Sequence, residues 1–222
     1  MTTAASLADS PRHWLVAVVF LPLIAVNLNY LISATHGYIP VCVPYLEGCT
    51  SISATGRSGI SYWLFKIMML PHAIVLTLFW RSLDRWLANS EAARHLASGR
   101  VVLMAGLLGA AFLVLYTVFL GSSGEIYRLM RRYGVFVFFL GTLIAQIAAT
   151  RRLGRLSDPA WQRTLVMQRV TLTIMGILAI AEVPLGKFGL ADSQAENFIE
   201  WNFSLAMQCW FASWWLGPGR RS

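Results

Sequence analysis

Three ionisable side chains lie inside apolar stretches of the sequence: Lys66, His72 and Glu182. A charged group is costly in hydrocarbon, so such residues usually face the interior of a helix bundle, where they pair or form a binding site. At a rise of about 1.5 Å per residue, Lys66 and Glu182 fall about 9 and 12 Å from the same edge of their spans. We therefore expect these two side chains to approach each other within the membrane.

Amide and carboxyl side chains fall in the same layer, namely Asn27, Asn29, Glu200 and Asn202. One interpretation is structural: a buried ion pair fixes the helix packing, and the asparagines bond between helices. The other interpretation is a cavity, open to the outer leaflet, that holds a lipid headgroup or an acyl ester. Lys66 could instead extend its ammonium group to the membrane interface, which would weaken both interpretations.

Three arginines crowd residues 121–132, which we expect to form an outer loop: Arg128, Arg131 and Arg132. They depart from the rule that cytoplasmic loops carry most of the basic residues. Either this is a chance exception, or the arginines form a patch that binds lipid phosphate, because guanidinium and backbone N–H groups suit phosphate oxygens.

Several chemistries find no support in the residues. A haem held by two histidines needs two such residues in the spans, and His72 is the one histidine there. No cluster of His and Asp suits a zinc hydrolase, and no nucleotide-binding or hydrolase motif occurs. We expect no metal and no cofactor, and we leave open whether the protein is an enzyme. His72 follows Pro71, so we expect its ring to bond to the backbone that the proline frees.

The elements that carry these residues are expected to be transmembrane helices. Of the 222 residues, 57% are hydrophobic and only 13% are charged. A soluble fold of this size could not bury so much apolar surface. In such a chain the net charge of +8 does not indicate binding of nucleic acid. Six apolar stretches approach the length of a span, so we predict an all-α, polytopic helix bundle in a single domain, 1–222. The predicted spans are 14–32, 60–80, 101–120, 133–149, 170–185 and 198–216.

The basic residues predict the orientation. With the N-terminus inside, most arginines lie on the inner side, and six spans then place both termini in the cytoplasm. We expect the plasma (inner) membrane. Tryptophans near the span ends are expected to form interfacial belts; they are Trp14, Trp63, Trp80, Trp86, Trp161, Trp201, Trp214 and Trp215.

Two of the three cysteines, Cys42 and Cys49, share the first outer loop. An outer loop faces an oxidising compartment, so we expect a local disulfide, with two free thiols as the alternative. Cys209 lies in the sixth predicted span and is expected to be a packing residue.

Four short stretches resemble one membrane-protein family. They are Val43-Pro-Tyr-Leu-Glu-Gly-Cys-Thr50, the segment from Trp63 to Trp80, Tyr133-Gly-Val-Phe-Val-Phe-Phe139, and Phe198-Ile-Glu-Trp201. The chain is similar to the FRAG/DRAM/SFK-type proteins, which include autophagy modulators, membrane-organising proteins and proteins that remodel the lipid of GPI anchors. The resemblance implies six spans with cytoplasmic termini and a role in lipid handling.

We therefore expect an integral membrane protein that handles or organises outer-leaflet lipid, with lipid remodelling as one form of this. The candidate headgroup residues are Asn27, Lys66, Glu182, Glu200, Asn202, Arg128, Arg131 and Arg132. The alternative is a non-catalytic scaffold or regulator that binds another membrane protein. A small-solute transporter is disfavoured, because no repeats or matched broken helices are visible.

Overall fold

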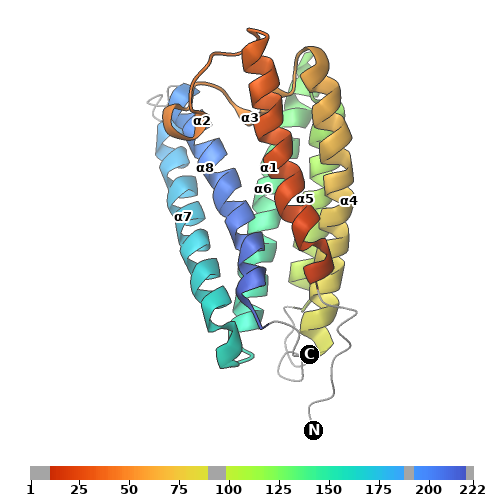
Figure 1. Ribbon diagram of the computed structural model, residues 1–222, viewed down its shortest axis with the longest axis vertical. Helices are drawn as coiled ribbons and strands as arrows, with labels where there is room; N and C mark the ends of the chain where they lie inside the picture. The colour runs from red at the N-terminus through yellow and green to blue at the C-terminus, as the bar shows by residue number, and fades with distance from the viewer. Residues whose placement is uncertain (1–10, 90–98, 188–192, 219–222) are drawn as a thin grey trace.

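The computed structural model describes residues 11–89, 99–187 and 193–218, with the backbone alone for Gly99 and for residues 182–187. The described chain is helical and contains no strand. Six long helices run along the long axis of the molecule (Figure 1). Their bounds are α1 Arg12–Thr35, α4 Gly59–Asn89, α5 Gly99–Phe119, α6 Glu125–Gly154, α7 Gln162–Lys187 and α8 Ser193–Ala212. Four short helices complete the described chain: α2 Pro44–Glu47, α3 Ile52–Thr55, η3 Pro159–Trp161 and η4 Ser213–Leu216.

Five of the six long helices are long and apolar enough to cross a membrane: α1, α4, α5, α6, and the segment Pro159–Ala181 at the start of α7. Together they indicate a membrane protein. The sixth, α8, is 20 residues long but carries Glu196, Asn197, Glu200, Asn202 and Gln208. These side chains are spread along α8, so it is not among the helices that are long and apolar enough to cross a membrane. Figure 1 shows α8 lying alongside α1 and α7 within the bundle.

Three helices, α4, α6 and α7, are much longer than the sequence predicted. The helix predicted for 60–80 continues to Asn89, because the segment after Trp80 is still amphipathic and buries Leu83 and Leu87. The loop predicted over residues 121–132 is wrong, since α6 begins at Glu125 directly after Gly124. Nothing between residues 125 and 133 interrupts a helix, and an acidic residue in the first turn suits a helix N-terminus. The arginines of this segment therefore project from a helix.

Helices α5 and α6 pack closely because glycines line their contact. A Cβ atom added at Gly141 would lie 2.8 Å from the carbonyl oxygen of Ala105, and one at Gly134 would lie 3.0 Å from the Cα of Tyr116. Small residues allow helix backbones to approach in this way, which is how many membrane helices associate.

Half of the eight tryptophans predicted to form interfacial belts are buried in the protein: Trp80, Trp161, Trp201 and Trp214. Trp210, which was not assigned to a belt, is fully buried as well. Trp80 and Trp210 pack against Phe211, with ring centroids 5.6 and 5.3 Å from its ring. Trp63 and Trp215 do remain exposed. The apolar core of the bundle is thus built partly from residues that the sequence assigned to the membrane interface.

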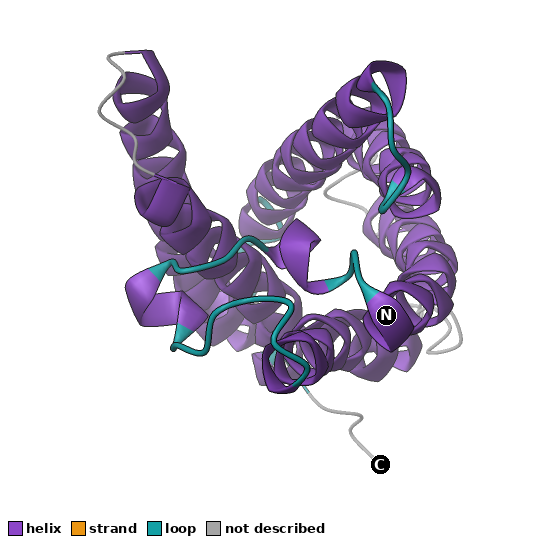
Figure 2. Ribbon diagram, turned by 90° about the horizontal axis from the view of Figure 1, so that it is seen from above, coloured by secondary structure: helices purple, strands orange, loops and turns teal. Residues whose placement is uncertain are grey.

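The bundle has two chemically different ends. At the first, the Arg12 guanidinium donates to the carbonyl of Trp214 and the Trp14 indole donates to Ser82, so the start of α1, the end of α4 and η4 lie together. We call this the basic end; its described arginines are Arg12, Arg81, Arg85, Arg100, Arg151, Arg152, Arg155, Arg163 and Arg169. The other end carries residues 36–58, which we call the cap. Figure 2, viewed along the bundle, shows the cap crossing this end.

Candidate functional site

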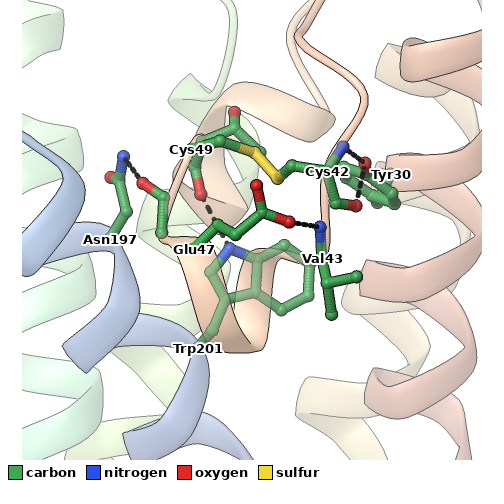
Figure 3. Close-up of a disulfide and its surroundings, with 9 residues drawn as sticks. Tyr30, Cys42, Val43, Glu47, Cys49, Asn197 and Trp201 are labelled. Carbon is green, nitrogen blue, oxygen red and sulfur yellow. Dashed lines mark hydrogen bonds between the residues drawn. A yellow bond between two sulfur atoms is a disulfide. The ribbon is translucent and has the colours of Figure 1, made fainter.

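The cap is a compact unit held by one disulfide. Cys42 and Cys49 are bonded, with their Cα atoms 6.5 Å apart, so the predicted pairing is present. Within the closed loop, the Glu47 carboxylate accepts a hydrogen bond from the backbone N–H of Val43 at 2.7 Å (Figure 3). A left-handed Gly48, with φ of 61°, ends α2 and turns the chain toward Cys49. The disulfide and this turn fix the shape of the cap.

Polar side chains on one helix, α8, bind the cap backbone. Asn197 donates to the carbonyl of Gly48 at 2.9 Å, and the buried Trp201 indole donates to the carbonyl of Thr50 at 2.8 Å (Figure 3). Glu200 accepts from the N–H of Ile52 at 3.2 Å. Asn202 donates to the carbonyl of Tyr45 at 2.9 Å. Three polar residues of α8, Asn197, Glu200 and Asn202, therefore hold the cap together with Trp201.

A second set of bonds ties the cap to α1. The Tyr45 hydroxyl exchanges hydrogen bonds with the Asn27 amide at 3.0 and 3.3 Å. The Tyr30 hydroxyl donates to the carbonyl of Cys42 and accepts from its N–H. Burial raises the pKa of the Tyr45 hydroxyl above its ordinary value. Asn29 differs from these residues, because its amide bonds back to Ala25 within α1 and not to another helix.

Beneath the cap lies a cavity of about 30 Å³, lined by side chains that include Glu200, Tyr116, Ser204 and Gln208. Its volume is close to the share of one water molecule. A lipid headgroup does not fit. Of the predicted polar layer, the structure thus brings Asn27, Glu200 and Asn202 together at the cap, but as anchors in a nearly solid arrangement.

Lys66 lies apart from these anchors. Its ammonium group donates to the carbonyl of Val118 at 3.0 Å and to the Tyr62 hydroxyl, and it lies 4.0 Å from the centroid of the Tyr62 ring. A cation at this point stabilises the C-terminal end of α5. Helix α4 packs on α1 and α5, whereas α7 packs on α8 and α6. The side chain of Glu182 lies outside the described residues, so its pairing with Lys66 stays a prediction.

The three arginines near the start of α6 have different environments. Arg131 donates to the carbonyls of Phe119 and Ser122 and so caps the end of α5. Arg128 is exposed and pairs with Glu125 at 2.7 Å. Arg132 is exposed as well. Only two of the three arginines therefore present a guanidinium group outward.

Beside and below these arginines, α6 presents an apolar stripe. Leu129, Tyr133, Phe136 and Leu140 are exposed to 45%, 61%, 61% and 42%. The spacing of three to four residues puts them on one helix face, together with Arg132. Arginine above exposed apolar side chains is the arrangement expected where a helix passes from phosphate groups into acyl chains. The spacing of these residues in the sequence could have revealed the stripe, had the segment been recognised as a helix.

The sequence analysis missed one buried ion pair. Arg152 on α6 is 2% exposed, and its guanidinium lies 2.9 Å from the carboxylate of Asp84 on α4, which is 21% exposed. Arg152 was assigned to the inner rim, and nothing in the spacing of the two residues points to their contact. The pair joins α4 to α6 at the basic end.

The His72 ring was expected to bond to the backbone that Pro71 frees. His72 is 1% exposed, and its Nδ1 has no hydrogen-bond partner among the described atoms, so this atom does not make the expected bond. The described part of the chain contains no group of three or more His, Cys, Asp or Glu residues that could hold a metal ion.

Comparison with known proteins adds no relative. No family model, no curated protein and no solved structure matches the chain. The class is therefore defined by the fold alone: an all-helical protein whose apolar helices indicate insertion in a membrane.

Proposed function

We propose that the protein is a six-span protein of the plasma membrane that organises anionic phospholipid of the outer leaflet on the surface of α6. The observation that carries this proposal is that exposed Arg128 and Arg132 lie on α6 next to its exposed apolar stripe. The cavity under the cap is too small for a headgroup, so the lipid contact is assigned to the helix surface. This also agrees with the resemblance to FRAG/DRAM/SFK-type proteins, which remains part of the proposal.

The proposed topology follows from the two ends of the bundle. Most of the described arginines lie at the basic end, which we place in the cytoplasm by the positive-inside rule. The disulfide-bonded cap is then outside, where a disulfide persists. We propose α8 as the sixth span. Three of its polar side chains bind the cap, and its indoles Trp201 and Trp210 are fully buried, so protein covers part of the surface of α8, while Phe198 and Leu205 are exposed.

The lipid proposal predicts local enrichment of anionic lipid beside α6. A bimane label at Leu129→Cys, in a Cys209→Ala background, should be quenched more by brominated phosphatidylglycerol than by brominated phosphatidylcholine in mixed vesicles. We expect a preference of about fivefold, corresponding to about one uncompensated cation near the surface, because Glu125 neutralises Arg128. The double variant Arg128→Gln/Arg132→Gln should lose this preference.

The matched control is Arg100→Gln, which removes an exposed arginine at the opposite end. It should keep the full preference at position 129. Equal quenching by the two lipids in the labelled protein that keeps Arg128 and Arg132 would refute the lipid proposal.

That refuting result would favour the second candidate, a scaffold that binds another membrane protein. A specific observation supports this candidate: the cap exposes Val41 to 83% and Leu46 to 75%, on a loop clipped by a disulfide. Exposed apolar side chains on a fixed loop suit contact with a partner.

A further inference from the structure

A second basic feature lies at the opposite end of the bundle, between α6 and α7. An open cleft of about 610 Å³ separates the two helices there. This volume is within the range of about 300–1,000 Å³ that is usual for small-ligand sites. Eight residues line it: Ile147, Thr150, Arg151, Gly154, Arg155, Arg169, Leu172 and Thr173.

The lining of this α6–α7 cleft is strongly cationic. Arg151 and Arg155 come from successive turns of α6, and Arg169 faces them from α7. All three side chains are exposed. No carboxylate is among the residues described as lining the cleft, and no described residue forms an ion pair with these three guanidinium groups. Three like charges around one cleft repel one another, so an anion bound between them would be stabilised.

Two residues of α6 shape the wall of the cleft: Gly154 lies beside the Arg169 side chain, and Thr150 bonds to the neighbouring helices. A Cβ atom added at Gly154 would lie 3.7 Å from the Nη2 atom of Arg169, so the guanidinium of α7 reaches over the α6 backbone. Thr150 donates to the Gln168 side chain at 3.0 Å and accepts from the buried Trp210 indole at 2.9 Å. These bonds tie α6, α7 and α8 together beside the cleft, so the helices that form its walls are held by protein contacts.

Apolar and polar groups divide the cleft along its length. Ile147 precedes Arg151 by one turn of α6, and Leu172 follows Arg169 by about one turn of α7. Both lie toward the centre of the bundle, while the arginines lie toward the basic end. An anionic group with an apolar extension would match this order of side chains.

We propose that the α6–α7 cleft binds a phosphate group through Arg151, Arg155 and Arg169, and that its source is the headgroup of an anionic phospholipid. Arginine suits phosphate because its planar guanidinium can bind two oxygens at once. The site is distinct from the α6 surface at the cap end, and neither depends on the other.

The test uses the full chain in detergent, titrated with phosphatidylglycerol or phosphatidylcholine and followed by native mass spectrometry. The triple variant Arg151→Gln/Arg155→Gln/Arg169→Gln should bind phosphatidylglycerol about a hundredfold more weakly, because each arginine near the membrane surface contributes about 1 kcal/mol. The matched control is Arg81→Gln/Arg85→Gln/Arg100→Gln, which removes three exposed arginines from the same end outside the cleft. It should bind as the unsubstituted protein does. Equal loss in both triple variants, or loss in neither, would overturn the proposal.

A second variant keeps all three charges and fills the space. Thr173→Trp changes an exposed residue of the cleft wall and should also weaken phosphatidylglycerol binding, because the larger side chain occupies space that the lipid would need. Retained binding in this variant would place the lipid outside the cleft and refute the site. This variant decides the matter alone if the triple variant does not fold.

Inorganic phosphate, titrated by calorimetry, separates the two sources of the phosphate group. No heat of binding, together with cleft-dependent phosphatidylglycerol binding, identifies a lipid ligand. Phosphate binding that disappears in the triple variant identifies a soluble phosphate-bearing ligand for the same arginines.

Discussion

Replacing Asp84 by alanine should destabilise the protein by about 3 kcal/mol. The change removes a carboxylate that lies 2.9 Å from a guanidinium with only 2% exposure. A buried charge that loses a neutralising partner keeps its desolvation cost without the compensating attraction, which is why breaking such pairs is expensive. Thermal unfolding of the purified protein in detergent, followed by loss of the monomeric peak, would measure the effect.

Two further variants make this prediction specific to the pair. Asp84→Leu/Arg152→Met should recover most of the lost stability, because two apolar side chains of similar size need no desolvation of charge. Arg85→Ala removes an exposed charge from the adjacent position and should change stability by less than about 0.5 kcal/mol. A single Asp84 variant as stable as Arg85→Ala would show that the ion pair contributes nothing.

Replacing Gly48 by alanine should detach the cap from α8, at a cost of about 3 kcal/mol or more. The added Cβ atom would lie 2.0 Å from the backbone carbonyl oxygen of Gln194, and neither backbone can yield without breaking the cap contacts. Gly48 also has a φ of 61°, which non-glycine residues adopt at a cost. Increased solvent exposure of Trp201 should accompany the lower melting temperature, and a red shift of the fluorescence that is absent in a matched Trp201→Phe background would assign it to this residue.

Gly37 provides a closely matched control. It has a φ of 71°, and a Cβ atom added there meets nothing within 4 Å. Gly37→Ala should therefore lower the free energy of unfolding by only about 1 kcal/mol, the cost of a left-handed backbone at a non-glycine residue, and leave Trp201 buried. If the two alanine variants lose equal stability, the close approach of the cap to α8 is not what positions the cap.

The helical class and the rough positions of the long helices were predictable from apolar composition and run length. Their ends were not, because α4 and α6 continue as amphipathic helices past the apolar stretches. A hydropathy average detects segments that are apolar on all sides, as lipid contact requires. These extensions are apolar only on the face that packs against the protein, so their average is low. Segments of this kind need a test for helical periodicity in addition to a test for apolarity.

The polar layer shows a different limit of sequence reasoning. Asn27, Glu200 and Asn202 were correctly grouped by depth, and the structure brings them to one place. Their role could not be read from the spans, since their partners are backbone groups and Tyr45 of the cap. Loop conformation depends on a disulfide and on tertiary contacts, which spacing alone does not determine. The same holds for the contact between Asp84 and Arg152, which depends on how α4 and α6 pack.

The most direct test of the account is the side of the membrane on which each segment lies. Fusions of alkaline phosphatase, which is active only outside the cytoplasm, should be active after Thr55 and after Ala191. They should be inactive after Arg94, after Arg155 and after Ser222, because six spans return the chain to the cytoplasm. Activity after Ser222 would show that α8 does not cross the membrane, and inactivity after Thr55 would place the cap inside, contradicting the proposed outer-leaflet role.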